Sequence, residues 1–341
     1  MTSNGTKSFR PSNLNGKIRL TPDLLLKGNF RGGYGDVYIG FYDRDDGKTQ
    51  KVAIKILRPP VDKPNTTGAV NDNRSRREIR VWKLLDHPNV AQLLGLTTDF
   101  DQLDRFFTTK SVFPGMVSLW MENGNLDAYL KKHSLQTAGL LKLVSISTFH
   151  ANNFAYSPQL CDVVAGLEYL HSEDIIHGDL TPANILIDDN GKACLTDFGL
   201  SSLKAGFQGT SYWTGTIGGA MRWRAPELLP SIHWDATVPF APVLTTACDI
   251  FSYGQIVLQV RVFSEQFPYY EIKSMDCLTI QLFLRKEPQR PSASISPKLT
   301  DKYWMLAKEC WGKDLNPDTR PSAEALRLRL VGLYENALRL Q

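Results

Sequence analysis

Four short motifs contain the residues of this chain whose types and spacing could do chemistry. They read Val-Ala-Ile-Lys at residues 52–55, His-Gly-Asp-Leu-Thr-Pro-Ala-Asn at 177–184, Asp-Phe-Gly at 197–199 and Ala-Pro-Glu at 225–227. Lys55 is a cation in an apolar segment, whereas Asn184 and Asp197 carry the hard oxygen atoms that magnesium prefers as ligands. Taken singly, a lysine in a strand is usually a snorkelling or edge residue and an aspartate is usually a helix cap or turn residue, so a role on phosphate and magnesium depends on the order of the motifs.

A glycine-rich segment precedes the first motif. Gly32, Gly33 and Gly35 lie between two strand-like segments, and Val37 follows them. Glycine lets the backbone approach phosphates closely and donate N–H groups to them. An ordinary glycine-rich hairpin would have the same composition, but the lysine motif a short distance later favours a loop that covers phosphates.

These residues need elements to hold them, and the hydrophobic patterns indicate strands first and helices later. Apolar segments at residues 36–42 and 51–57, joined by a polar turn at 44–48, are typical of a hairpin. Apolar residues at helical spacing predict a helix over residues 72–85. Further strands are expected near residues 91–96 and 116–121, and further helices at 126–132, 160–171, 249–260, 300–310 and 322–338.

Composition narrows the class of protein. The 341 residues are 42% hydrophobic with a net charge of +4, and no basic run indicates nucleic acid or a membrane as a partner. The five cysteines are scattered without metal-ligand spacing, which indicates reduced thiols. Residues 1–17 lack the apolar core of a signal peptide, and no stretch has the length of a membrane span. We therefore expect a soluble, intracellular protein of the cytoplasm.

In their order, the four motifs resemble those of the eukaryotic protein kinase catalytic domain, from about residue 24 onward. The sequences at residues 87–90, 121–126 and 166–171 are most similar to the tyrosine-kinase-like group, whose members mostly phosphorylate Ser and Thr. The resemblance implies an α+β, two-lobed fold. It has a small antiparallel-sheet N-lobe with one helix and a larger, mainly helical C-lobe. The implied parts are a disordered tail at residues 1–22, the N-lobe at 23–117, and the hinge and C-lobe at 118–341.

The resemblance also implies a reaction and a role for each motif residue. ATP and Mg²⁺ would be the cofactors, a protein would be the substrate, and the γ-phosphate would pass to a Ser or Thr hydroxyl. Asp179 would be the catalytic base, and Lys55, held by Glu78, would bind phosphates. Asn184 and Asp197 would hold magnesium. The other nucleotide contacts implied are Gly32, Gly33, Gly35, Val37, Ala53, Ser118, Met121 and Leu186.

Two structural ties are implied as well. Glu227 of the Ala-Pro-Glu motif would pair with Arg320. Asp249 would hold the catalytic loop, which is the segment at residues 177–184.

Three residues depart from the family pattern. Phe30 stands at the first glycine position, Gly178 replaces an arginine beside Asp179, and Thr181 replaces a lysine used near the transferred phosphate. These departures motivate an alternative, a pseudokinase that binds nucleotide and acts as a scaffold or allosteric module.

Two stretches interrupt the expected helical pattern. Residues 144–159 separate two segments that would otherwise form one continuous helix, and they are interpreted as a surface insertion or translated intron sequence. Residues 231–245 are a weaker second case, expected as an exposed loop. A poorly folding product of a misannotated gene is the corresponding alternative for the whole chain.

Overall fold

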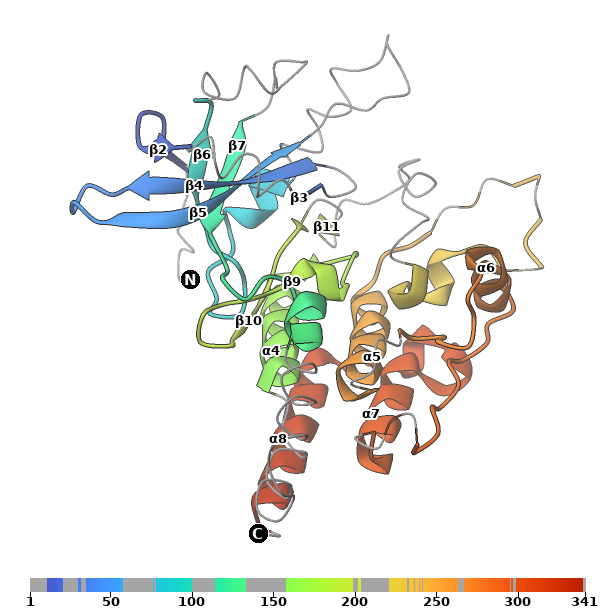
Figure 1. The fold of residues 1–341 in the computed structure, drawn as a ribbon. Helices are drawn as coiled ribbons and strands as arrows, with labels where there is room; N and C mark the ends of the chain where they lie inside the picture. The colour runs from blue at the N-terminus through green and yellow to red at the C-terminus, as the bar shows by residue number, and fades with distance from the viewer. Residues whose placement is uncertain are drawn as a thin grey trace, which may run out of the picture. The chain divides into compact units, whose positions relative to one another are not determined.

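The structure is a computed structural model that divides the chain into two compact units, residues 1–120 and 121–341 (Figure 1). It describes residues 11–20, 30–31, 35–57, 76, 78–99, 114–132, 158–198, 202–203, 221–231, 233–235, 237–238, 240, 242–262, 267–294, 296 and 299–339.

The N-terminal unit is built on one sheet. Its strands are β1 (Ser12–Asn13), β2 (Ile18–Arg19), β3 (Phe30–Arg31), β4 (Gly35–Asp43), β5 (Thr49–Leu57), β6 (Leu93–Thr97) and β7 (Gly115–Leu119). The order is β1-β6-β7-β5-β4-β2, with β3 paired to β4. The β1–β6 pair is parallel and the other pairs are antiparallel. The predicted strands therefore exist, each within two or three residues of its expected bounds.

The β4–β5 hairpin forms where the sequence predicted it. Its turn closes with a hydrogen bond from the Arg44 N–H to the Lys48 carbonyl at 2.9 Å. Gly47 has φ 78°, a conformation that glycine adopts without steric cost. The helix after this hairpin includes residues 78–82 and becomes a turn at 83–84, so it ends before the predicted residue 85.

The prediction of a disordered tail over residues 1–22 is wrong for residues 11–20, which we call the N-terminal strap. The strap supplies β1 and β2, and its Leu14, Ile18 and Leu20 are buried in the core of the sheet. Taken together, these three apolar residues follow neither helical nor strand periodicity. The polar composition of the surrounding residues therefore led to the prediction of disorder. Residues 1–10 and 21–22 lie outside the described residues.

The C-terminal unit is mainly helical. Besides the helical residues 126–132, where a helix was predicted, its helices are α4 (Pro158–Ser172), α5 (Thr246–Val262), α6 (Met275–Phe283), α7 (Asp301–Trp311) and α8 (Ala323–Arg339). Short strands form two antiparallel pairs, β9 (Ile185–Ile187) with β10 (Ala193–Leu195) and β8 (Ile175–Ile176) with β11 (Ser202–Leu203). Five 3₁₀ helices are described, namely η1 (Pro182–Asn184), η4 (Met221–Trp223), η5 (Pro226–Leu228), η6 (Lys313–Leu315) and η7 (Pro317–Thr319).

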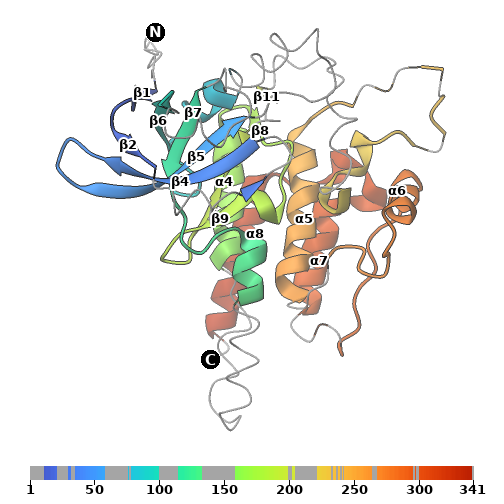
Figure 2. The same ribbon diagram turned by 45° about the horizontal axis from the view of Figure 1, so that its top comes forward.

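The helices pack in pairs, α4 beside α8 and α5 beside α7 (Figure 2). Leu160, Val163 and Leu167 of α4 are fully buried, in agreement with the predicted amphipathic pattern. The α5 helix is buried on almost every side, including its polar residues Asp249, Ser252, Gln255 and Gln259, because other elements surround it. No helix within the described ranges combines the length and hydrophobicity that crossing a bilayer requires.

The two suggested insertions fall partly outside the described residues. Pro158 and Gln159, which we placed at the end of the first stretch, form the first turn of α4, where proline fits because its missing N–H has no helical partner. Residues 144–157 lie outside the description. Among residues 231–245, the described ones form turns and extended segments, with exposed Trp234, Val238 and Val243.

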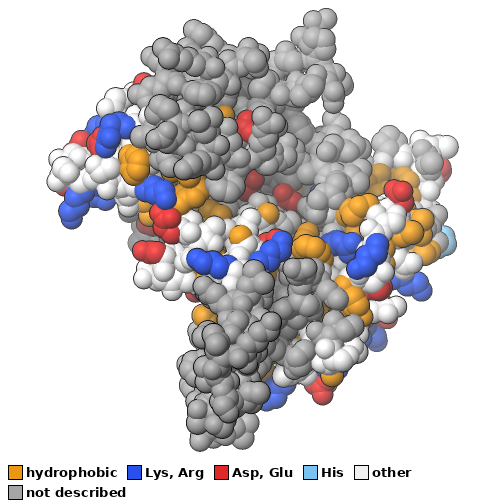
Figure 3. All heavy atoms as spheres, in the orientation of Figure 1, with side chains coloured by type: hydrophobic (Ala, Val, Ile, Leu, Met, Phe, Trp, Pro, Cys, Tyr) orange, Lys and Arg blue, Asp and Glu red, His pale blue; other side chains and the backbone are white. Residues whose placement is uncertain are grey.

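The described surface carries mixed side chains. Basic, acidic and apolar groups are interspersed over the face in Figure 3. Exposed apolar residues include Met275 and Ile280 of α6, and Leu284 directly after it.

Candidate active site

The N-terminal unit holds a buried ion pair on its sheet. Lys55 lies on β5 between Val37 of β4 and Met116 of β7. Its Nζ is 2.6 Å from Oε1 of Glu78, and the Glu78 side chain is 0% exposed. The Glu78 carboxylate has almost no access to water, and the positive charge of Lys55 compensates the free-energy cost of that desolvation. This pairing holds the lysine side chain in one position. The pairing expected from the sequence is therefore present.

The other expected nucleotide contacts of this unit lie near Lys55 in the sheet. Ala53 pairs with Ser118, whose side chain is buried. Gly35 begins β4, where an added Cβ would be 2.7 Å from the Ile56 carbonyl oxygen, so the strand pairing itself requires glycine. Gly32 and Gly33 lie outside the described residues.

In the C-terminal unit, Asn184 stabilises the catalytic loop. Its Nδ2 donates to the Asp179 carbonyl at 2.8 Å, and it is 3.4 Å from Oδ2 of the same residue. Asn184 ends η1, where its N–H donates to the Thr181 carbonyl at 3.0 Å. Because Nδ2 serves the loop, the amide oxygen is the atom of this side chain that a cation can use.

Asp249, in the first turn of α5, holds the start of the loop. Its Oδ2 accepts from the His177 N–H and contacts Nε2 of His171, both at 2.9 Å, and its Oδ1 accepts from the Gly178 N–H at 2.9 Å. Burial alone would raise the pKa of Asp249, but the hydrogen bond and charge of His171 bring it below its ordinary value. Gly178 has φ 77°, so the turn that makes these bonds favours glycine over arginine.

Asp197 follows β10 and lies close to Asp179. It has φ 65°, in a region where aspartate is enriched among non-glycine residues. Burial raises the pKa of Asp179, and the negative charge of Asp197 raises it further. The next residue, Phe198, is fully buried with its ring 5.6 Å from that of His177. Two acidic groups and the Asn184 amide are thus gathered at this loop.

The donor set fits magnesium. Within the described residues, His, Cys, Asp and Glu do not gather in threes around a possible metal position. Magnesium usually takes one or two protein oxygens and completes its shell with phosphate oxygens and water, which Asp197 and Asn184 would allow. Two other expected contacts lie in this unit. Leu186 pairs with Cys194 between β9 and β10, and the Met121 carbonyl accepts from Gly124 at 3.0 Å.

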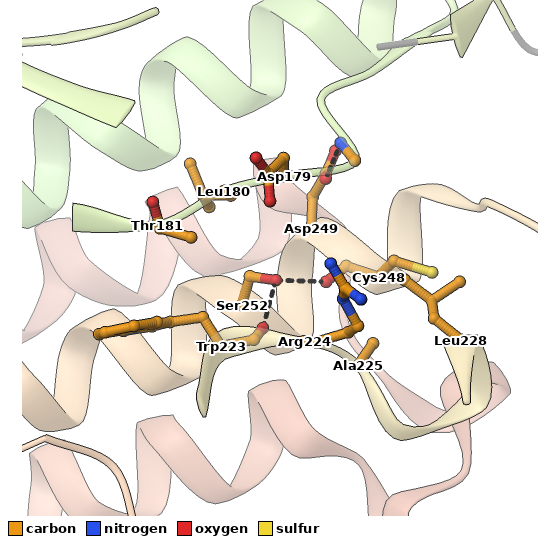
Figure 4. A pocket seen from close by; sticks show the side chains of 11 residues that line it. Asp179, Leu180, Thr181, Trp223, Arg224, Ala225, Leu228, Cys248, Asp249 and Ser252 are labelled. Atoms are coloured by element: carbon orange, nitrogen blue, oxygen red, sulfur yellow. Dashed lines mark hydrogen bonds between the residues drawn. The ribbon is translucent and has the colours of Figure 1, made fainter. Parts of the chain in front are cut away.

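One functional candidate was missed by the sequence reasoning. Arg224 is only 6% exposed and lines a small pocket together with Asp179 and Thr181 (Figure 4). The pocket wall is fixed by Ser252, whose Oγ donates to the Trp223 carbonyl at 2.7 Å. The available signal was a basic residue directly before Ala-Pro-Glu, in a chain whose catalytic loop has no lysine or arginine.

The expected pair of Glu227 and Arg320 is present and anchors the Ala-Pro-Glu motif that follows Arg224. Arg320 donates from Nη1 and Nη2 to the two carboxylate oxygens at 2.5 and 2.9 Å. It also donates to the carbonyls of Ala247, Trp311 and Leu315, so all five of its N–H groups are used.

Comparisons with known proteins give a consistent result. A family model described as protein tyrosine and serine/threonine kinase matches residues 28–330. The chain is 27% identical over 296 residues to ephrin type-B receptor 1 of Gallus gallus, covering 85% of this chain and 25% of the receptor. It is 27% identical over 301 residues to tyrosine-protein kinase receptor TYRO3 of Gallus gallus, covering 88% of this chain and 30% of that protein. The chain therefore spans about a quarter to a third of the length of these curated relatives.

Proposed function

Because the chain belongs to the protein tyrosine and serine/threonine kinase family, we propose that it transfers the γ-phosphate of ATP to a hydroxyl group of a protein. The sheet-based unit and the helical unit are the small and large lobes of the two-lobed kinase fold. The observation that carries the proposal is the catalytic loop, in which Asn184 binds Asp179 and Asp249 holds the two residues before it.

The reaction assigns one task to each group. Asp179 accepts the proton of the substrate hydroxyl, whose oxygen bonds to the γ-phosphorus. The bond from that phosphorus to the β–γ bridging oxygen breaks, and ADP leaves with the electron pair. Lys55, fixed by Glu78, binds phosphate oxygens. Bound magnesium, held by Asn184 and Asp197, would neutralise phosphate charge.

The acceptor amino acid is a separate part of the proposal. The similarity of three segments to the tyrosine-kinase-like group supports Ser or Thr. The name of one relative, a tyrosine-protein kinase receptor, favours Tyr instead. We propose Ser or Thr, and phosphoamino-acid analysis of the product distinguishes the two.

A pseudokinase that binds nucleotide without transfer is the second candidate. The absence of lysine and arginine from residues 177–187 favours it, because the family lysine near the transferred phosphate is replaced by Thr181. This candidate predicts ATP binding by a well-folded protein that leaves no label on any acceptor.

The proposal is tested by mixing the purified full chain with labelled ATP, magnesium and a generic basic protein, and by measuring the transfer of label to that acceptor. Asp179→Asn and Lys55→Met should each lower the transfer rate by about 100-fold or more, since each removes a group that acts on the reacting atoms. The matched controls are the exposed Asp189→Asn and Lys48→Met, which should keep the parent rate. A folded parent that binds ATP but transfers nothing, to the acceptor or to itself, would refute kinase activity.

A further inference from the structure

The catalytic loop lacks a positive charge of its own. Residues 177–187 contain no lysine or arginine, although the phosphoryl group in transfer carries negative charge on its three outer oxygens. A cation next to Asp179 would stabilise that charge and also the contact between the phosphoryl group and the carboxylate. The charge must then come from another segment of the chain.

Arg224 is placed to supply it. It follows η4 and precedes Ala225, and it lines the same pocket as Asp179, Leu180 and Thr181. Figure 4 shows its guanidinium group extending from this segment into the pocket, on the side where Asp179 and Asp249 lie. The pocket has room for about one water molecule, so the groups that line it are close together.

Burial of this arginine requires an anion in its surroundings. An uncompensated buried charge is strongly destabilising, and an apolar residue at position 224 would avoid that loss of stability. Two carboxylates line the pocket. Asp249 already engages both oxygens with His171, His177 and Gly178. Asp179 is the other, and it lines the same small pocket as Arg224.

We propose that Arg224 provides the positive charge missing from the catalytic loop, contacting the transferred phosphoryl group beside Asp179. This inference rests on the proposed phosphoryl transfer. Arginine suits the task because its guanidinium stays charged and its planar fork matches two phosphate oxygens at once. Arg224 neither gains nor loses a proton, and the proton of the acceptor hydroxyl still goes to Asp179.

Arg224→Met tests the inference in the full chain, with kcat measured at saturating ATP and acceptor. We expect kcat to fall by about 100-fold, as for loss of one charged donor at a reacting group, with little change in KM for ATP. Adding Thr181→Lys to Arg224→Met returns a cation to the catalytic loop and should recover at least about 10-fold of the loss. A purely structural arginine would not be replaced by a lysine at position 181.

Arg222→Met is the matched control two residues earlier. Arg222 donates to the carbonyls of Pro268, Tyr269 and Ile272 at 2.7 to 2.8 Å, so its loss should lower the melting temperature but leave kcat of the folded protein near the parent value. The inference is overturned by an active parent and an equally active Arg224→Met protein. It is also overturned by a loss that follows the melting temperature and that Thr181→Lys does not relieve. An inactive parent would refute the proposed function itself, and the inference with it.

Discussion

Adding one methyl group at Gly95 should destabilise the N-terminal unit through the strap. A Cβ there would lie 2.4 Å from the Ser12 carbonyl oxygen and 2.7 Å from Cγ of Leu14. Both distances are far below van der Waals contact, so β1 must move away from β6. Leu14 is 2% exposed, and its complete withdrawal would cost about 2–5 kcal/mol, as for a buried Leu→Ala change. Partial movement makes about 1–3 kcal/mol the expected loss for Gly95→Ala.

Urea unfolding followed by circular dichroism measures this loss, and a double-mutant cycle assigns it to the strap. In a Leu14→Ala background, where part of the obstruction is gone, Gly95→Ala should cost about 1 kcal/mol less. Gly332→Ala in α8 is the control, because an added Cβ meets nothing within 4 Å and alanine favours the helix. Additive costs for Gly95→Ala and Leu14→Ala, or a Gly95→Ala protein as stable as the control, would refute the reasoning.

Two further predictions concern the supports of the site. Asp249→Asn should lower the free energy of unfolding by about 2 kcal/mol or more, because one amide oxygen cannot replace a carboxylate that accepts from several N–H groups. The pKa of Asp249 is lower in the folded protein than in the unfolded chain, where it is about 4. The stabilisation by Asp249 is therefore present above the unfolded pKa and is lost as pH falls through the lower folded pKa. Melting curves of parent and variant should then converge only in strong acid. Arg320→Lys should destabilise the C-terminal unit by about 3 kcal/mol, since an ammonium group cannot make the paired bonds to Glu227; thermal unfolding equal to the parent would contradict this.

Motif order and local chemistry made part of the site predictable from the sequence. Lys55 and Glu78 could be paired only through the order of the motifs and the family resemblance that it carries, because a lysine in a strand would otherwise be read as a snorkelling or edge residue. The hairpin turn at residues 44–48 was predictable because Gly47 supplies its positive φ.

Features that depend on tertiary packing could not be predicted from the sequence. Leu14, Ile18 and Leu20 show their burial only when the sheet is assembled, and they precede the residues that the family model matches. The direction of Arg224, inward beside Asp179 rather than outward to water, follows from the path of the chain between η4 and η5, which no local pattern specifies.

The Glu227–Arg320 pair also bears on how the chain matures during synthesis. The two residues are separated by 93 positions. At ribosomal speeds of 5–20 residues per second, Glu227 exists for about 5 to 20 seconds before Arg320 is made. During that interval the segment that includes Ala225 and Pro226 lacks its final anchor, and the polypeptide exposes an unfinished surface to chaperones and proteases. A pause in translation before residue 320 would prolong that vulnerable interval, and faster translation would shorten it.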